Sequence, residues 1–278
     1  MTDGDRIPVS VVILSHNEAH NLPRCIEALK RCAEVVVLDD GSTDASQQIA
    51  AEAGARVVEH PYTSFADQRN WAMAHASLAC PWVLHLDADE VMTHSALSEI
   101  KSLLPSMTAD RVGFIARKVM LDDRWLRFSA DYPVYVPRLL HQDGPRFVMR
   151  GHGEIIEAEP AAGVMLKEPM LHFSFSKGWP DWWERHRRYA RAEAERIAEG
   201  LPPLSFRGLF SSDRTLRRAA LRALSYRVPG RPALRFLYAY VLRLGFMDGR
   251  PGFDFCRAMA RYEQMISDEL KQSAWTSS

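Results

Sequence analysis

The chain lacks the long apolar run that a membrane-spanning segment or a secretory leader requires. Its first residues, Met-Thr-Asp-Gly-Asp-Arg, are not followed by the apolar core of a signal peptide. An apolar stretch late in the chain, residues 232–245, is shorter than the roughly 20 residues that cross a bilayer. It also contains two charged side chains, Arg235 and Arg243. We therefore expect a protein of the reducing cytoplasm with no spanning segment.

Cysteine is scarce, and its spacing indicates neither a disulfide framework nor a zinc site. The four cysteines are Cys25, Cys32, Cys80 and Cys256. No histidine or cysteine pair has the spacing of zinc ligands. Cys25 and Cys32 lie two helical turns apart, so we expect both in the core.

Neither sign of charge is in excess. Lysine and arginine number 35, aspartate and glutamate number 35, and the formal net charge is zero. A protein whose main partner is nucleic acid usually carries an overall basic surface. We therefore expect no nucleic-acid partner. The 278 residues suffice for one α/β domain with a helical appendage, and they contain no internal repeat.

Strand and helix patterns alternate along the first ninety residues. Apolar runs predict buried strands, which are expected at 9–14, 35–38, 56–59 and just before Asp87. Helices are expected between them, one starting after Asn21 and one at 65–76. This alternation predicts a mostly parallel sheet flanked by helices, which binds its ligand beyond the carboxyl ends of the strands.

Polar clusters follow three of these strands, at residues 15–18, 39–44 and 87–90. Carboxyl ends of parallel strands share one edge of a sheet, so the clusters should converge. The segment after the first strand, Ser-His-Asn-Glu, contains no glycine. It therefore differs from the glycine-rich phosphate loop expected of a nucleotidyltransferase that makes activated sugars.

The third cluster contains two aspartates separated by one small residue, Asp87 and Asp89. Extended backbone puts both carboxylates on the same side. Mg²⁺ and Mn²⁺ prefer one or two carboxylates together with phosphate oxygens of a substrate. Taken alone, such a triplet is also common as a solvated turn, so its context decides.

In context, the chain resembles the family two glycosyltransferases with a GT-A fold. The matching segments are 9–18 (VSVVILSHNE), 38–44 (LDDGSTD), 68–70 (QRN) and 86–90 (LDADE). The resemblance implies an α/β fold with a Rossmann-like, mostly parallel central sheet, a nucleotide-sugar donor and a divalent metal.

The resemblance also implies positions for the donor and the metal. It assigns nucleotide contacts to six residues: Leu14, Ser15, Glu18, Asp40, Arg69 and Asp87. Among these, Asp40 would hydrogen-bond the base, Arg69 would lie near the base or the phosphates, and Asp87 would lie by the ribose and the metal. Asp89 would ligate Mg²⁺ or Mn²⁺. Each residue has a structural alternative: Asp40 could cap a helix, and Arg69 could pair with a nearby acidic side chain.

The second half of the predicted domain carries further motifs. Residues 112–119 predict a strand, and 121–135 mix charge with aromatic side chains, as sugar sites often do. The segments 137–140 (PRLL) and 150–154 (RGHGE) resemble positions of the lipopolysaccharide core glucosyltransferase branch of the family. Many of that branch have adjacent histidine and glutamate, whereas Gly153 separates them here. Which side chain faces the acceptor hydroxyl therefore stays open.

An inverting transferase needs one base to take the proton of the acceptor hydroxyl. We choose Glu154, whose apolar neighbours predict a partly buried carboxylate, with His152 orienting it or binding the leaving phosphate. Glu157 and Asp131 are the alternative bases, and Glu154 could also be an exposed strand residue. Two arginines are candidates for stabilising the departing diphosphate: Arg138 and Arg150.

The C-terminal third predicts helices of another kind. A charged helix is expected at 181–199, a basic amphipathic helix at 214–227 and an apolar helix at 232–245. Arginine-rich, aromatic helices suit an interfacial contact with a membrane, although the apolar helix could instead pack on the catalytic domain or a second subunit. The segment 244–253 resembles a tail of the same transferases.

We therefore expect three regions: a nucleotide-sugar-binding half at 1–110, an acceptor-binding half at 111–178 and a helical membrane-associating extension at 179–278. The expected activity is inverting transfer of a hexose, from UDP-glucose by default, to a lipid-linked or lipopolysaccharide-like acceptor. It would occur at the inner face of the cytoplasmic membrane, which the protein contacts peripherally. The alternatives are a polyprenyl-phosphate glycosyltransferase, a sugar nucleotidyltransferase and an inactive membrane-bound scaffold.

Overall fold

The structure of the protein is a computed structural model that describes residues 6–150, 153–157, 162–200, 203–227 and 230–276. The chain forms two compact units. Unit 1 comprises Met1–Trp125 and Asp131–Lys177, and unit 2 comprises Leu126–Ala130 and Gly178–Ser278. The short segment Leu126–Ala130 therefore leaves the sheet-forming unit and belongs to the helical one.

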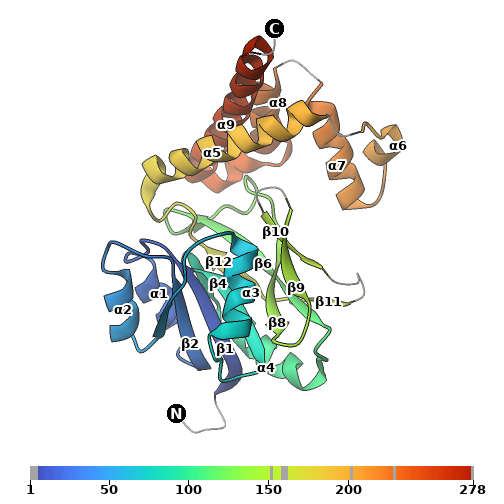
Figure 1. The fold of residues 1–278 in the computed structure, drawn as a ribbon. Helices are drawn as coiled ribbons and strands as arrows, with labels where there is room; N and C mark the ends of the chain where they lie inside the picture. The colour runs from blue at the N-terminus through green and yellow to red at the C-terminus, as the bar shows by residue number, and fades with distance from the viewer. Residues whose placement is uncertain (1–5, 151–152, 158–161, 201–202, 228–229, 277–278) are drawn as a thin grey trace. The chain divides into compact units, whose positions relative to one another are not determined.

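Parallel strands at the N-terminal end of the chain form one side of the sheet in unit 1 (Figure 1). They are β1 (Ile7–Ser15), β2 (Cys32–Asp39), β3 (Arg56–Glu59) and β4 (Trp82–Asp87). Strand β1 lies between β2 and β4, and β3 pairs with the outer side of β2. The register sets Ser15 opposite Asp39 and Leu14 opposite Asp87, so the expected polar clusters lie at one edge.

The remaining strands make the sheet mixed. They are β5 (Glu90–Met92), β6 (Val112–Leu121), β7 (Arg124–Trp125), β8 (Tyr135–His141), β11 (Gly163–Met165) and β12 (Met170–His172). Strand β8 runs antiparallel between β4 and β6. A separate antiparallel pair is formed by β9 (Arg146–Arg150) and β10 (Gly153–Glu157).

Helices cover both faces of the sheet, so the central strand β1 is buried on both sides. In the described part of unit 1 they are α1 (Leu22–Glu27), α2 (Ser46–Glu52), α3 (Phe65–His75), α4 (His94–Leu103) and the short 3₁₀ helix Leu104–Ser106. Side chains of α1, α2 and α4 share a core with Val9 and Val11. Side chains of α3 share the opposite core with Val12. Burial on both faces explains the continuous apolar run of this strand.

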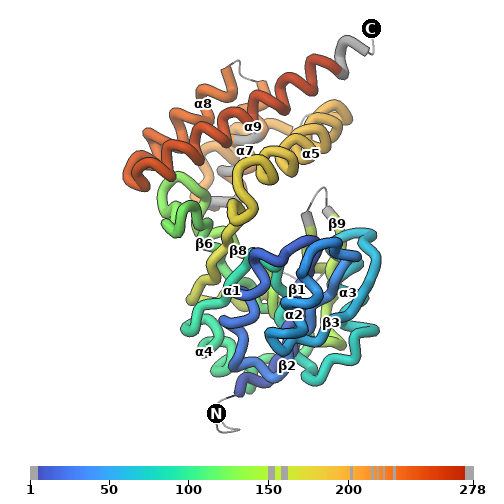
Figure 2. Tube along the Cα trace, turned by 90° about the vertical axis from the view of Figure 1, so that its left-hand side faces the viewer, coloured from blue at the N-terminus to red at the C-terminus, as the bar shows by residue number. Residues whose placement is uncertain are grey.

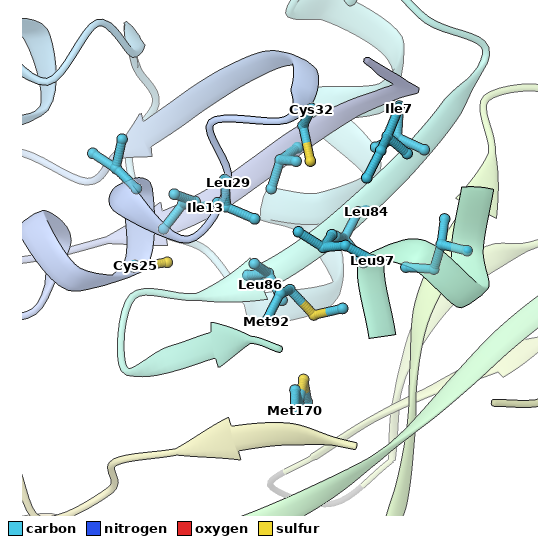
Figure 3. Packing of buried hydrophobic residues seen from close by; sticks show 14 of the residues in the cluster. Ile7, Ile13, Cys25, Leu29, Cys32, Leu84, Leu86, Met92, Leu97 and Met170 are labelled. Atoms are coloured by element: carbon cyan, nitrogen blue, oxygen red, sulfur yellow. The ribbon is translucent and has the colours of Figure 1, made fainter. Parts of the chain in front are cut away.

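Two of the cysteines lie in the first of these cores. Figure 3 shows Cys25 and Cys32 among aliphatic side chains such as Leu29. Burial raises the pKa of the Cys32 thiol to about 12, so the thiol stays protonated and acts as a small apolar group. The expectation that both residues are core is confirmed.

Unit 2 is helical in its described residues. Its elements are α5 (Gly178–Glu199), α6 (Phe206–Leu209), α7 (Arg214–Ser225), α8 (Arg231–Leu237), the π-helix Tyr238–Leu242, the 3₁₀ helix Gly245–Asp248 and α9 (Gly249–Thr276). Helices α5 and α8 both contact α9, as Figure 2 shows. Small and apolar side chains join α5 to α9, among them Ala190, Ala194 and Ile266.

The α/β fold and the helical extension expected from the sequence are confirmed. The extension differs in detail, because the expected apolar helix ends as α8 at Leu237 and continues as one π-helical segment. None of the helices that the structure describes is long and apolar enough to cross a membrane.

Candidate active site

The candidate site lies at the carboxyl ends of β1, β2 and β4, where polar side chains converge as expected. Ser15 ends β1 and is buried, and its carbonyl accepts a hydrogen bond from the backbone N–H of Asp40 (3.0 Å). The half-buried Leu14 pairs in register with Asp87 on one side and Leu38 on the other. This edge therefore positions residues from three separate sequence segments together.

The two aspartates at the end of β2, Asp39 and Asp40, differ in burial and in hydrogen-bond partners. Asp39 is fully buried and accepts hydrogen bonds from Ser42 N (2.8 Å), Ser42 Oγ (2.6 Å) and Gln47 Nε2 (2.8 Å). Burial opposes its ionisation, but the hydrogen bonds from Ser42 and Gln47 prevail and lower the pKa of Asp39. Asp39 therefore fixes the loop, a function that the sequence reading did not assign.

Asp40 is the aspartate of this pair that a ligand can reach. Its side chain is 27% exposed, and Oδ1 accepts the backbone N–H of Tyr62 (3.0 Å). Oδ2 lies 3.6 Å from His16 Nδ1. The carboxylate is thus oriented by the loops after β1 and β3 at the edge where the resemblance places a nucleotide base.

Glu18 lies in the loop after β1 and pairs with a residue from the far end of unit 1. Lys177 Nζ lies 2.5 Å from its Oε1, and Asn21 Nδ2 donates to Oε2 (2.7 Å). Burial raises the pKa of the Glu18 carboxyl despite Lys177 and Asn21, and the negative charge of Asp89 adds to this rise. The negative charges of Glu18 and Asp89 therefore repel each other. No local sequence pattern indicates that Lys177 is a partner of Glu18.

Asp87, at the end of β4, lies between two buried guanidinium groups. Arg69 of α3 donates through Nη2 to Oδ1 (2.6 Å), and Arg138 of β8 donates through Nη2 to Oδ2 (3.0 Å). The arginines are 1% and 2% exposed, while the Asp87 side chain is 34% exposed. Burial opposes ionisation, but the charges of Arg138 and Arg69 hold the pKa of Asp87 well below its usual range. Asp87 is therefore ionised at any physiological pH.

Glu154, the expected base, joins the same cluster from β10. Arg69 Nε donates to its Oε1 (2.8 Å) and Oε2 (2.9 Å), and Arg138 Nη1 donates to Oε1 (2.9 Å). The side chain is 13% exposed, so the expected partial burial is confirmed. Its hydrogen-bond partners among the described residues are the guanidinium groups of these two arginines. His152 lies outside the described residues, as does the side chain of Arg150.

Arg138 is an internal counter-ion, which corrects the expectation that it faces the leaving diphosphate. It donates to Glu90 through Nε (2.9 Å) and Nη2 (2.8 Å), besides Asp87 and Glu154, and it lies 3.5 Å from the carbonyl of Pro137. Its N–H groups are thereby all directed at protein oxygens. Glu90 is fully buried and needs this partner. Glu90 was expected in the polar cluster at 87–90 and as a possible surface partner of Arg69, whereas it is buried and pairs with Arg138.

Arg69, in contrast, keeps spare hydrogen-bonding capacity. Among the residues that the structure describes, its buried Nη1 has no hydrogen-bond acceptor. A buried unpaired guanidinium N–H is costly unless an anion completes it. Of the two arginines, Arg69 is therefore the one with donors left for a bound phosphate.

Asp89 completes the acidic group. Its side chain is 16% exposed, its Oδ2 lies 3.4 Å from His172 Nε2, and its carbonyl accepts the backbone N–H of Phe173 (2.8 Å). Strand β12 thus contributes a histidine to the site, which the sequence reading missed because His172 lies more than eighty residues away.

The side chains of the site fit a divalent cation only when a bound diphosphate supplies further oxygen atoms to the metal. Within the described residues, no three acidic, histidine or cysteine side chains are grouped to hold a metal by themselves. Three carboxylates nevertheless pair with two arginines here: Asp87, Glu90 and Glu154. A fourth, Asp89, follows Asp87 by two residues and lies beside His172. A cluster with excess negative charge repels a diphosphate unless a cation compensates. One or two carboxylates with phosphate oxygens is the usual Mg²⁺ arrangement.

A mixed α/β sheet with acidic and guanidinium groups at the carboxyl edge of its parallel strands defines an enzyme of the nucleotide-binding α/β class. A comparison with protein families refines this class. The model of "Glycosyl transferase family 2" matches residues 10–150, just over half of the chain. The chain belongs to this family.

Among curated relatives, the chain is 35% identical over 109 residues to the lipopolysaccharide core biosynthesis glycosyltransferase LpsC of Rhizobium meliloti. This match covers 37% of the chain and 38% of LpsC, so the chain spans less than two fifths of that relative. It is also 36% identical over 95 residues to undecaprenyl-phosphate 4-deoxy-4-formamido-L-arabinose transferase of Pseudomonas fluorescens, covering 29% of the chain and 27% of the relative.

Among solved structures, the chain is similar to glucosyl-3-phosphoglycerate synthase of Mycobacterium tuberculosis in complex with Mn²⁺ and UDP-glucose. The identity is 22%, the TM-score is 0.34, and the match covers 40% of this chain and 43% of that one.

Proposed function

We propose that the protein is a metal-dependent inverting glycosyltransferase that moves a hexose from a nucleotide sugar to a cell-envelope glycan. UDP-glucose is the first donor to test. The observation that carries this proposal is the charge cluster at the carboxyl edge of the sheet, where Asp87, Arg69 and Glu154 are in direct contact beside Asp89. Membership of the family supports the reaction class.

The donor nucleotide would bind within residues 1–110. Leu14, Ser15 and Glu18 would line it, because they end or follow the central strand. Asp40 would accept the N–H of a uracil base through its exposed carboxylate. Arg69 would donate to the diphosphate through its spare N–H groups.

Asp89 and Asp87 would hold the divalent cation, Mg²⁺ or Mn²⁺. When bound, such an ion offsets the negative charge of the diphosphate and makes it a better leaving group. Arg69 and Arg138 would keep Asp87 ionised and oriented for this function.

Glu154 would act as the base, and residues 111–178 would bind the acceptor. Oε1 of Glu154 accepts from both arginines, whereas Oε2 accepts only from Arg69 Nε among the described residues. Each carboxylate oxygen has two lone pairs, so Oε2 is the atom assigned to take the proton of the acceptor hydroxyl. The hydroxyl oxygen would then attack the anomeric carbon from the face opposite the diphosphate. Glu157 and Asp131 remain the other candidate bases, and His152 would orient Glu154 or bind the leaving phosphate.

The acceptor would be a lipopolysaccharide-like or other lipid-linked glycan, reached peripherally at the inner face of the cytoplasmic membrane. The name of the relative LpsC supports a lipopolysaccharide core acceptor. The name of the second relative, an undecaprenyl-phosphate transferase, supports a polyprenyl phosphate instead. A phosphate acceptor needs no strong base, so Glu154 separates the two candidates.

A transfer assay with UDP-glucose, Mn²⁺ and isolated lipopolysaccharide core or undecaprenyl phosphate tests these assignments. Asp89→Ala should lower kcat by roughly a thousandfold while the fold is retained. The control Asp143→Ala removes a carboxylate that is 89% exposed in a turn, and it should leave kcat unchanged. Near-normal turnover in Asp89→Ala would refute the metal site.

A second variant, Glu154→Gln, distinguishes the two candidate acceptors. Glu154→Gln keeps the shape and the capacity to accept from an arginine but removes the base. It should lower transfer to a sugar hydroxyl by about a hundredfold or more. Full activity of this variant with undecaprenyl phosphate, and none with a glycan, would establish the polyprenyl-phosphate alternative.

A further inference from the structure

Large apolar side chains are exposed along one continuous segment of unit 2, from the end of α8 through the π-helix to the 3₁₀ helix that precedes α9. Leu242 is 75% exposed and Met247 is 58% exposed. We call the exposed set the apolar surface, and its members are Leu234, Leu237, Tyr238, Val241, Leu242, Leu244, Phe246 and Met247. Contiguous exposure on this scale marks an interaction site rather than ordinary surface.

Hydrogen bonds hold this segment in place. Asp248 accepts the backbone N–H groups of Arg127 (3.1 Å), Phe128 (3.0 Å) and Ser129 (2.7 Å), and Arg243 Nη2 donates to the carbonyl of Ala130 (3.0 Å). These contacts all lie within unit 2. The apolar side chains cannot turn inward without breaking them, so the fold itself keeps these side chains on the outside.

Close packing at a glycine fixes the same segment. A Cβ on Gly245 would lie 2.6 Å from the carbonyl oxygen of Ala239 and 3.2 Å from Cys256 Sγ. The backbone between the π-helix and α9 is therefore closely packed in one conformation. Leu244 in this segment adopts the left-handed region, at φ 62°. An ordered apolar surface of this kind is typical of a docking element.

The charge around the apolar surface is mainly positive. Residues 231–263 contain six arginines, two aspartates and one glutamate, Glu263, which pairs with Arg231, so the net charge is +3. Asp248 is engaged by backbone N–H groups and Asp254 by Arg250 (2.8 Å). Arg250 and Arg257 keep side chains that are 80% and 71% exposed. Exposed cations of this kind attract the anionic headgroups of a membrane.

An apolar groove of about 470 Å³ borders the same surface between α8 and α9. Its lining includes Phe236, Leu237, Ala260 and Arg261. Its walls are mainly apolar, so this open groove extends the apolar surface.

We infer that the apolar surface docks on a lipid bilayer that carries anionic headgroups, with its leucines and Phe246 entering the interface and the arginines binding phosphates. A second copy of the chain is the alternative occupant. A symmetric dimer through this surface would oppose two arginine-rich faces and repel itself. The inference does not depend on sugar transfer, because lipid binding can be measured without any donor or acceptor.

Co-sedimentation with vesicles tests the inference. The full chain should bind vesicles of phosphatidylcholine with phosphatidylglycerol at least about tenfold more tightly than phosphatidylcholine alone, and added salt should weaken this binding. The double variant Leu242→Glu with Met247→Glu should lose about tenfold or more in affinity. The control Met165→Glu alters a methionine of similar exposure, 55%, on β11 of unit 1 and should bind like the unchanged protein.

A second pair of substitutions keeps the test valid if the glutamates disturb folding. Arg250→Gln with Arg257→Gln leaves the apolar surface intact and should still weaken binding to the anionic vesicles. Circular dichroism checks the fold of each variant. Absence of vesicle binding would overturn the inference, as would equal binding to both vesicle types. A dimer seen by light scattering that Leu242→Glu dissociates would assign the surface to self-association instead.

Discussion

At the scale of single residues, the site depends on two buried arginines that connect carboxylates from distant parts of the chain. The sequence predicted Asp87, Asp89 and Arg69 because each lies in a recognisable segment at a strand end or on α3. It could not predict that Lys177 pairs with Glu18 or that His172 approaches Asp89. Those pairs form across more than eighty residues, and only the tertiary fold brings them together.

Removing Arg138 is the residue change with the largest expected cost. Arg138→Met would leave Glu90, which is fully buried, and part of Asp87 without a cation. An uncompensated buried charge costs about 3–5 kcal/mol. Urea unfolding should show this loss in the free energy of unfolding. Arg124→Met, at an exposed position of β7, should change it by less than about 0.5 kcal/mol, and an equal effect of both variants would contradict the account.

At the scale of elements, the pattern of alternating strands and helices predicted unit 1 better than unit 2. Strand β3 spans the predicted residues, whereas no separate helix was predicted at the position of α9 within the expected helical extension. Its first turn contains two glycines and Pro251, a composition that indicates a loop when it is read alone. Proline is tolerated in the first turn, because the N–H groups there have no intrahelical partner.

The contact between α5 and α9 carries a pH dependence. His186 of α5 stacks on Trp182, with ring centroids 3.4 Å apart, and packs edge-on against Tyr262 of α9. Burial lowers the pKa of His186 from 6.5 to about 4, although the ring also bonds the carbonyl of Trp182. Between these values the unfolded chain binds more protons than the folded one, so stability falls as the pH falls from 6.5 towards 4.

His186→Phe tests this dependence, because it keeps an aromatic ring and removes the titration. Urea unfolding at pH 7 and pH 5 should show that the variant loses less stability on acidification than the unchanged protein. We expect a difference of about 1 kcal/mol, since the ring is partly exposed. Identical losses in both proteins would show that His186 does not titrate in this window.

Asp248 makes the segment before α9 dependent on one side chain. Asp248→Ala would remove the acceptor for three backbone N–H groups and for Ser129 Oγ (2.7 Å). Donors left unpaired should lower the free energy of unfolding by about 2–3 kcal/mol. The matched control is Asp268→Ala on the exposed side of α9, where Asp268 accepts a hydrogen bond only from Gln264 among the described residues. Equal unfolding curves for the two variants would contradict the anchoring function.

At the scale of the whole molecule, the sequence predicted the α/β class and a helical extension, and the structure has both. The sequence did not predict that Leu126–Ala130 belongs to the helical unit. That assignment depends on hydrogen bonds to Asp248 and Arg243, which lie more than a hundred residues further along the chain. Local periodicity carries no signal for such contacts.

The measurement that tests the central claim most directly is a thermal-shift titration with UDP, with and without Mn²⁺, on the unchanged protein and on Asp89→Ala. A ligand at a hundredfold its Kd stabilises by about 2.7 kcal/mol, which should raise Tm by roughly 5 °C. The account predicts this rise only when UDP and Mn²⁺ are both present, and its loss in Asp89→Ala. A rise that Asp89→Ala retains, or no response of the unchanged protein to UDP with Mn²⁺, would contradict it.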